Sequence, residues 1–256
     1  MAKRSPLAEK LDEVRDRIAA AAAKAKRDPR EITLVAVTKT AGLEQIREMI
    51  SLGVNDLGEN RVQQLTQRAA QLNEFLQRRQ AFGESAPVPD KVRWHMIGHL
   101  QRNKAKQLLP VVHSIHSIDS LRLAEDLDLL SEKMGRKTSV MLQVNASEEP
   151  QKSGVAVGAA VHLAEQIASM PNLALTGLMT MAEQDIPEAK LRQTFARVRE
   201  IFEEMKWQKI GGGDLKHISM GMSDDFENAI LEGSTMVRIG SLLFGGKVAD
   251  HEEAED

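Results

Sequence analysis

Short apolar runs alternate with amphipathic helical segments along most of the chain. The apolar runs are four to eight residues long and rich in aliphatic and β-branched residues, which is typical of strands. Each is followed by residues whose apolar positions recur three or four apart, which predicts a helix. The pattern therefore predicts an α/β fold, a single (β/α)8 TIM-type barrel. The predicted strands lie at residues 32–39, 53–58, 92–97, 111–118, 139–144, 173–179, 217–220 and 236–239.

An extra helix is predicted before the first strand. Ser5 and Pro6 suit its N-cap and its first turn, and an apolar stripe begins at Leu7 and Leu11. The helix is expected to end before Pro29, because the residue that precedes a proline disfavours helical backbone angles. The barrel therefore carries an N-terminal helix in addition to its eight strand-helix pairs.

The chain has 256 residues, and barrels of this type commonly contain about 250. We expect residues 1–246 to form one barrel domain that includes the N-terminal helix, and residues 247–256 to form an acidic disordered tail. Residues 80–91 contain two prolines and one glycine without any period, and they are predicted to be a flexible connection. The alternative fold is a doubly wound open sheet, but its G-x-G-x-x-G turn after the first strand is absent.

The composition is that of an ordinary globular protein, with 42% hydrophobic and 28% charged residues and a formal net charge of −3. The lack of a basic excess argues against nucleic acid as a partner. No apolar run approaches the roughly 18 residues of a membrane span, and the start of the chain lacks an apolar signal segment, so we expect a cytoplasmic protein without membrane contact. The chain has no cysteine, which excludes disulfides and thiolate catalysis, and no tyrosine, which removes one common catalytic acid or base.

The first predicted strand ends in Lys39. In parallel α/β folds the carboxyl ends of the strands face the ligand site, so Lys39 is expected at the mouth of the barrel. Two interpretations remain open. The lysine either marks the point where the strand leaves the core, or its amine forms a Schiff base with a carbonyl ligand.

The last two strands end in glycine and serine residues that suit a phosphate site. In such barrels a phosphate commonly binds the loops after strands seven and eight, where backbone N–H groups point at the anion. Gly221 and Gly240 allow close approach of the backbone, and alternation puts Arg238 on the same face as Gly240. These residues also have ordinary roles, since glycines shape turns and serines cap helices. The hydroxyls placed to donate to a phosphate belong to Ser219, Ser223 and Ser241.

A lysine, a phosphate cradle and an arginine at one mouth of the barrel together suit pyridoxal 5′-phosphate (PLP). The amine of Lys39 would form the imine, the cradle would hold the phosphate, and Arg238 would meet the pyridine nitrogen. A permanently cationic arginine disfavours protonation of that nitrogen. PLP is therefore the expected cofactor, and a weaker electron sink is expected than an aspartate partner would give.

Six segments occur in order over nearly the whole chain: AVTKT, GEN, WHMIGHLQRNK, GLMTM, HISMGMSDDF and VRIGSLLFG. They resemble the YggS/PROSC family of pyridoxal phosphate homeostasis proteins, which are single-domain relatives of the barrel of bacterial alanine racemase. The resemblance implies that Lys39 carries the cofactor and that Arg238 faces the pyridine nitrogen, with the serines and Gly240 around the phosphate. The cofactor-binding residues that it implies are Lys39, Asn60, His95, Ser219, Ser223, Arg238, Gly240 and Ser241.

Two of these residues have a structural interpretation of equal weight. Asn60 suits the N-cap of the next helix, with Gln63 placed to complete a capping box. His95 suits a hydrogen-bonded histidine at the end of a strand. Their role in lining the pocket comes from the resemblance.

Binding without turnover is the expected function. Racemisation needs a second base opposite the lysine, which in alanine racemase is a tyrosine from an added domain of the other subunit, and this chain has no tyrosine. The resemblance implies a carrier that holds PLP as a reversible Schiff base in intracellular PLP homeostasis, with no catalytic residue. The alternatives are a PLP-dependent amino-acid racemase and a class I aldolase that uses the same lysine without a cofactor.

PLP is the expected partner, and PLP-dependent apo-enzymes are candidate recipients of it. The chain is expected to be a monomer, because the racemase dimer depends on the domain that is missing here. No metal site is expected. His113 and His116 are three residues apart, which on a strand would put them on opposite faces.

Overall fold

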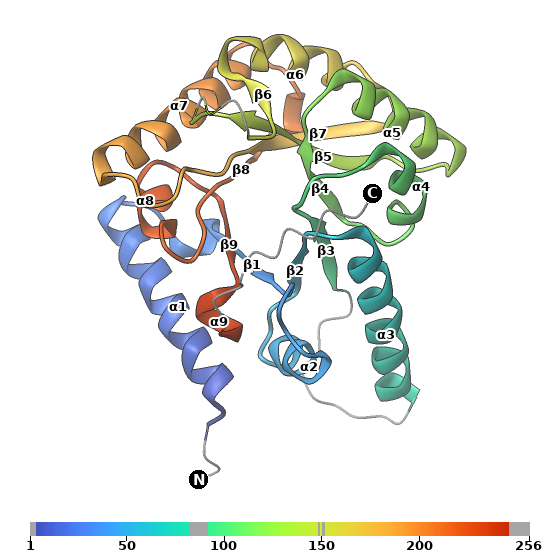
Figure 1. The fold of residues 1–256 in the computed structure, drawn as a ribbon, viewed down its shortest axis with the longest axis vertical. Coiled ribbons are helices and arrows are strands. Elements are labelled where there is room, and N and C mark those ends of the chain that lie inside the picture. Colours follow the sequence, from blue (N-terminus) through green and yellow to red (C-terminus); the bar gives the residue numbers. More distant parts are fainter. Residues whose placement is uncertain (1–3, 82–91, 148, 150–151, 246–256) are drawn as a thin grey trace.

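The structure, a computed structural model, describes residues 4–81, 92–147, 149 and 152–245. Eight parallel strands form a closed barrel in the order β1-β2-β3-β4-β5-β7-β8-β9, and β9 pairs again with β1 (Figure 1). A two-residue strand, β6 (Val155–Ala156), is added beside β5. The strands of the barrel are β1 (Thr33–Val37), β2 (Asp56–Glu59), β3 (Arg93–Met96), β4 (Ser114–Ile118), β5 (Thr138–Asn145), β7 (Leu173–Met179), β8 (His217–Ser219) and β9 (Met236–Ile239).

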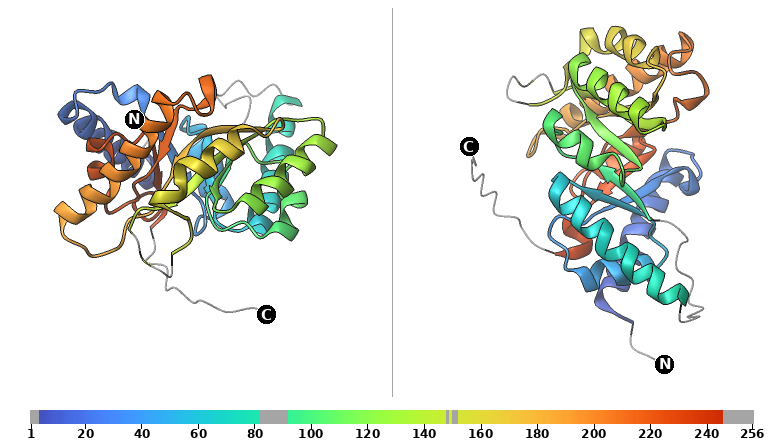
Figure 2. Two further views of the ribbon diagram at one scale, coloured as in Figure 1. Left: turned by 90° about the horizontal axis from the view of Figure 1, so that it is seen from above. Right: turned by 90° about the vertical axis from the view of Figure 1, so that its right-hand side faces the viewer.

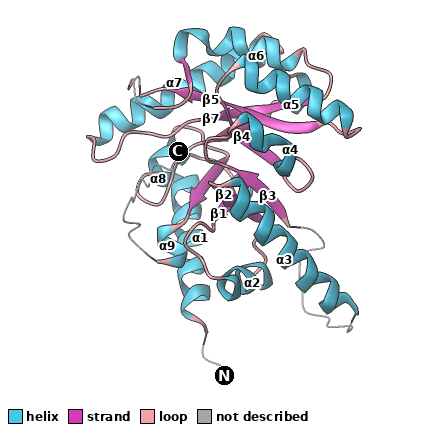
Figure 3. Cartoon of the chain, turned by 45° about the vertical axis from the view of Figure 1, so that its right-hand side comes forward, coloured by secondary structure: helices cyan, strands magenta, loops and turns pink. Residues whose placement is uncertain are grey.

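Helices surround the strands on the outside of the barrel, as Figure 1 and the two turned views of Figure 2 show. Colouring by secondary structure separates the strands in the middle from the helices around them (Figure 3). The helices are α1 (Pro6–Lys24), α2 (Leu43–Ser51), α3 (Val62–Ala81), α4 (Ala105–Leu108), α5 (Leu121–Lys133), α6 (Ala160–Ala168), α7 (Glu188–Trp207), α8 (Phe226–Leu231) and α9 (Ser241–Phe244). None of the helices in the described part of the chain has the length and hydropathy of a membrane span.

The extra helix α1 packs against the helices that follow the last two strands of the barrel. The hydroxyl of Ser5 accepts a hydrogen bond from the N–H of Ala8, and Pro6 occupies the first turn. The buried face of α1 packs against the two short helices α8 and α9. Arg17 of α1 also pairs with Glu227 of α8 at 2.7 Å. The helix thus fixes the segments that follow β8 and β9.

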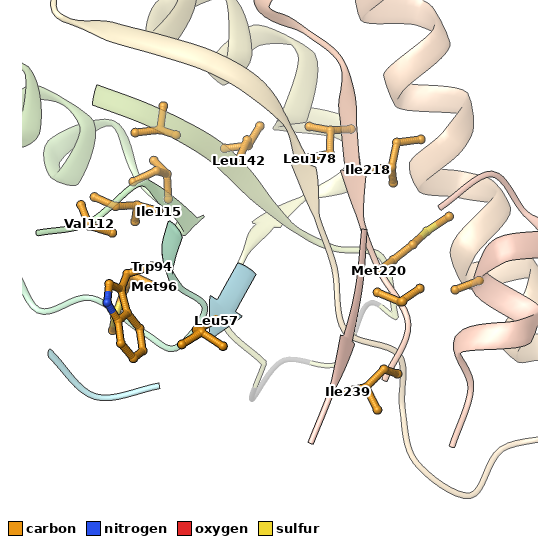
Figure 4. Close-up of a cluster of buried hydrophobic side chains, with 14 of the residues drawn as sticks. Leu57, Trp94, Met96, Val112, Ile115, Leu142, Leu178, Ile218, Met220 and Ile239 are labelled. Carbon is orange, nitrogen blue, oxygen red and sulfur yellow. The ribbon is translucent and has the colours of Figure 1, made fainter. Parts of the chain in front are cut away.

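The main core lies between the strands and the helices, where outward-facing strand residues such as Leu57, Leu142, Leu178 and Ile218 are fully or almost fully buried (Figure 4). Successive residues of a strand point to opposite faces. Four inward-facing apolar residues, Val35, Met141, Met179 and Met236, form a second, small cluster. The barrel interior is therefore a packed core at this level, and a ligand site has to lie above it at the mouth.

The predicted barrel and its extra N-terminal helix are confirmed. The second strand differs from the prediction, because β2 begins at Asp56 and includes Gly58 instead of ending there. A Cβ on Gly58 would lie 3.0 Å from Val35 and 3.1 Å from Ile97, so this glycine allows close packing inside the barrel. Helix α6 begins only at Ala160, because β6 and a 3-10 turn occupy the residues after β5.

Three further predictions concern the tail, the connection before β3 and the start of β4. The predicted acidic tail, residues 247–256, lies outside the described residues, and so does most of the predicted connection at residues 80–91. Strand β4 begins at Ser114, three residues later than predicted, because residues 111–113 belong to the turn that precedes it.

Candidate functional site

Lys39 lies in the turn that follows β1, at the carboxyl-terminal mouth of the barrel. Its side chain is exposed, whereas Thr38 before it and Ala41 after it are buried. The N–H of Ala41 donates to the carbonyl of Thr38 at 2.8 Å and closes the turn. The amine of Lys39 is therefore accessible on a backbone that is anchored on both sides.

A buried ion pair braces this turn from the outer side of the barrel. Glu59 at the end of β2 is fully buried, pairs with Arg68 of α3 and accepts a hydrogen bond from the hydroxyl of Thr38. The guanidinium of Arg68 also donates to the carbonyl of Thr38 and, at 2.9 Å, to the carbonyl of Ala41. The sequence reasoning missed this brace, since no spacing along the chain links α3 to the turn after β1.

The turn after β8 requires glycine at residue 221. Gly221 has a φ of +95°, and a Cβ there would lie 2.6 Å from the Cβ of Ala229 in α8. Ser223 is buried in the same turn, and the N–H of Met222 donates to the carboxylate of Asp225 just before α8. Burial raises the pKa of Asp225, and the bond from Met222 opposes that effect. The turn is thus held close to the start of α8.

The turn after β9 lies directly beside β1. Val35 is the register partner of Arg238, and a Cβ on Gly240 would lie 3.2 Å from the Cβ of Val37 and 3.3 Å from its carbonyl oxygen. Ser241 is exposed and begins α9, and the N–H groups of Leu243 and Phe244 close this turn by donating to the carbonyl of Gly240 at 3.1 Å and 2.9 Å. The turn that carries Gly240 therefore neighbours the strand that leads into the turn of Lys39, as the order of strands predicts.

Arg238 points into the barrel and is buried. Its Nη1 atom donates to the carbonyl and to the hydroxyl oxygen of Ser219, both at 2.7 Å, and its Nη2 atom donates to the carbonyl of Thr180 at 2.9 Å. Burial lowers the pKa of Arg238 to about 10, which leaves the guanidinium charged at neutral pH. Its strand neighbours Val237 and Ile239 belong to the outer core, so the alternation of the strand turns Arg238 toward the interior.

Below Arg238, a line of hydrogen bonds continues through the interior of the barrel. The hydroxyl of Ser219 lies 3.0 Å from Nδ1 of His116, and Nε2 of His116 lies 2.9 Å from Nδ1 of His95. Nε2 of His95 lies 2.8 Å from Asp56, which also receives two bonds from Arg93. His95 is therefore part of the buried interior below Arg238, and the hydroxyl of Ser219 is engaged there with Arg238.

The pKa values of two groups along this line are shifted in definite directions. Burial holds the pKa of His116 well below its usual value, and the nearby His95 and Arg238 act in the same direction, so His116 is neutral. Burial opposes ionisation of Asp56, but the hydrogen bonds from Arg93 and His95 outweigh it and leave the pKa of Asp56 below its usual value. Asp56 is therefore a carboxylate.

The expected arrangement of His113 and His116 on opposite faces is wrong. His113 precedes β4, and the rings of His113 and His116 both contact His95, with centroids 5.5 Å and 5.0 Å from it. The turn before β4 changes the side-chain alternation that a continuous strand would impose. Within the described ranges no group of three or more histidine, aspartate or glutamate side chains is arranged to hold a metal ion.

Asn60 lies between β2 and α3 and is exposed at the mouth of the barrel. Helix α3 begins at Val62, and the N–H of Leu65 donates to the carbonyl of Arg61. Arg61 therefore occupies the N-cap position. The prediction that Asn60 is the N-cap is wrong by one residue. A Cβ on Gly98 would lie 2.2 Å from the carbonyl oxygen of Asn60, so the loop after β3 packs against the Asn60 backbone.

Residues 10–248 of the chain match the alanine racemase N-terminal domain family. A protein of Pseudomonas aeruginosa named pyridoxal phosphate homeostasis protein is 38% identical over 244 residues, which are 95% of this chain and 96% of that protein. The protein of the same name from Escherichia coli is 36% identical over 241 residues, 94% of this chain and 97% of that protein. The chain belongs to the pyridoxal phosphate homeostasis protein family.

Solved structures share the fold of this chain. PipY of Synechococcus elongatus, in a structure described as having PLP bound, has a TM-score of 0.76 and 30% identity, and the match covers 93% of this chain and 100% of that chain. An alanine racemase of Clostridium difficile has a TM-score of 0.71 at 13% identity and is covered over 57% of its length, so it shows a common fold alone.

Proposed function

We propose that this chain binds PLP at the carboxyl-terminal mouth of its barrel, as a reversible Schiff base with Lys39, and serves PLP homeostasis without turnover. The observation that carries the proposal is the pairing of β1 with β9. It sets the turn of the exposed Lys39 beside the turn of Gly240 and Ser241, with the buried Arg238 two residues before Gly240 on β9. The PLP named in the PipY structure and the names of the relatives support the same ligand.

The residues at this mouth suit each part of PLP. A phosphate needs hydroxyl donors beside a backbone that it can approach, and Ser223 and Ser241 supply the hydroxyls while Gly240 lacks a side chain that would block the approach. The pyridine nitrogen needs a charged partner that cannot move, and Arg238 has three bonds that hold it. When bound, PLP supplies an aldehyde that combines reversibly with amines.

The residues of the chain favour holding the cofactor over using it. Arg238 remains cationic, so it offers no proton acceptor and disfavours a protonated ring nitrogen. Two histidines, His95 and His99, are candidates for a second base. Both nitrogens of His95 are engaged with Asp56 and His116 inside the barrel, and Nδ1 of His99 lies 3.3 Å from the carboxylate of Asp119. The sequence contains no tyrosine to take that role. Delivery of PLP to apo-enzymes, a cytoplasmic location and a monomeric state are parts of the same proposal.

Reduction with borohydride tests the Schiff base and the rival functions together. The protein is incubated with PLP, reduced and digested, and the modified peptide is identified by mass spectrometry. The proposal expects a pyridoxyl group on Lys39. A class I aldolase would instead be trapped by a sugar phosphate on that lysine and would take up no PLP. A racemase would exchange the α-hydrogen of an amino acid with solvent, and would lose this exchange in Lys39→Ala.

A further inference from the structure

A continuous line of five side chains joins Arg238 at the candidate site to Asp56 at the opposite end of the barrel. It passes from Arg238 through Ser219, His116 and His95 to Asp56. Every member is at most 6% exposed, so each donor has to find its acceptor within the protein. The positions of the protons on the two imidazoles are therefore fixed by the ends of the line.

The direction of the bonds follows from the chemistry at each end. Asp56 is held as a carboxylate by two bonds from Arg93, so it accepts and the proton of this contact lies on Nε2 of His95. A neutral His95 then accepts at Nδ1 from the Nε2–H of His116. The remaining Nδ1 of His116 accepts from the hydroxyl of Ser219, whose oxygen accepts from Arg238. All five groups are then satisfied.

The opposite direction leaves a buried donor without an acceptor. If His95 were doubly protonated, His116 would have to donate to Ser219, and the oxygen of Ser219 would accept from both His116 and Arg238. The hydroxyl proton of Ser219 would then need another acceptor in a fully buried place. An unpaired buried donor costs about 1–3 kcal/mol, so the first arrangement is favoured.

We propose that Asp56, His95, His116 and Ser219 form a one-way hydrogen-bonded chain that orients the guanidinium of Arg238 toward the ring nitrogen of bound PLP. Ser219 and His116 are thus positioning residues for Arg238. This inference rests on the proposed function for its ligand, but the tautomers that it requires belong to the protein alone. In this inference the hydroxyl of Ser219 positions Arg238, whereas the hydroxyls of Ser223 and Ser241 are the proposed donors to the phosphate.

The first test measures the tautomers without any ligand. Long-range 1H–15N correlation spectra of protein labelled with 15N-histidine distinguish a ring protonated at Nε2 from one protonated at Nδ1 or at both. The inference expects Nε2–H on both His95 and His116, assigned by their single substitutions. Protonation of either ring at Nδ1 overturns the proposed direction of the hydrogen bonds, whether or not the protein binds PLP.

The second test measures the effect on the ligand. PLP labelled with 15N in its ring is bound to wild type and to Ser219→Ala, and the ring-nitrogen resonance and the dissociation constant are recorded. Loss of the hydroxyl is expected to move the resonance and to weaken binding about tenfold, because a hydrogen bond to a charged group is lost. Ser223→Ala is the contrast, since it is expected to weaken binding without moving the resonance. An unchanged resonance in Ser219→Ala overturns the inference.

Two substitutions of His116 separate positioning from packing. His116→Asn keeps an acceptor close to where Nδ1 lies, and His116→Gln places its amide close to where Nε2 lies. Asn is expected to leave the ring-nitrogen resonance near that of wild type, and Gln is expected to shift it as Ser219→Ala does. Equal spectra for the two variants contradict the positioning role. A wild-type protein that takes up no PLP contradicts the proposed function. The tautomer test still decides whether the hydrogen-bonded line from Asp56 to Arg238 has the proposed direction.

Discussion

Val35 of β1 is the register partner of Arg238 of β9, and the next inward residue of β1, Val37, lies against Gly240. These contacts close the barrel between its first and last strands. They also bring the turn of Lys39 beside the turn of Ser241, although the two residues are far apart in the sequence. The contact between Val37 and Gly240 is so close that a methyl group on residue 240 would displace the turn.

Gly240→Ala is expected to weaken PLP binding about tenfold, because its Cβ would lie 3.2 Å from the Cβ of Val37 and displace the turn. Titration of the absorption spectrum with PLP measures the effect. Gly158→Ala is the matched control, since a Cβ there meets nothing within 4 Å. Equal affinities for the two variants would show that the turn after β9 does not contact the ligand.

Gly221→Ala is expected to destabilise the fold more than Gly53→Ala. Both glycines have positive φ, +95° and +84°, and a substitution in this region costs roughly 1–3 kcal/mol. The Cβ on residue 221 would also lie 2.6 Å from that of Ala229, whereas residue 53 has open space. Thermal unfolding of the two variants therefore isolates the clash with α8. Similar melting temperatures would argue against this tight contact.

Arg68→Ala is expected to lower the free energy of unfolding by about 3 kcal/mol, because it leaves the carboxylate of Glu59 buried without its partner. Adding Glu59→Gln removes the unpaired charge, so the double variant is expected to lose less than the sum of the two single losses. Denaturant unfolding of the three variants gives the coupling energy. Simple additivity would mean that the ion pair does not brace the turn of Lys39.

Stability is expected to fall as the pH drops below about 6.5. Burial lowers the pKa of His116 and of His217 in the folded state, with His95 adding to both shifts. The unfolded chain takes up these protons near pH 6.5 and the folded chain does not, so the stabilisation present above that pH is lost by up to about 1.4 kcal/mol per pH unit for each group. Melting temperatures across this range should fall less steeply in His116→Asn than in a control with the exposed His162→Asn. Parallel curves would contradict the burial of a neutral His116.

The barrel could be predicted because strand and helix periodicity is local in the sequence. Lys39, Gly221 and Arg238 could be placed at one mouth because the carboxyl ends of parallel strands share an edge. The partners of these residues could not be predicted in the same way. Arg68 reaches the turn of Lys39 from another helix, and His116 meets Ser219 across the barrel, so both contacts depend on the closed geometry. A buried acid such as Asp56 in a strand is a signal that could have indicated an internal polar line.

The most direct test of the account is the visible absorption spectrum of the purified protein after PLP is added and the excess removed. Wild type is compared with Lys39→Ala and with Lys137→Ala, a lysine just before β5 at the opposite mouth of the barrel. A Schiff base at Lys39 predicts a yellow imine band in wild type and Lys137→Ala that is missing in Lys39→Ala. A band of equal strength in all three proteins, or no band in wild type, would contradict it.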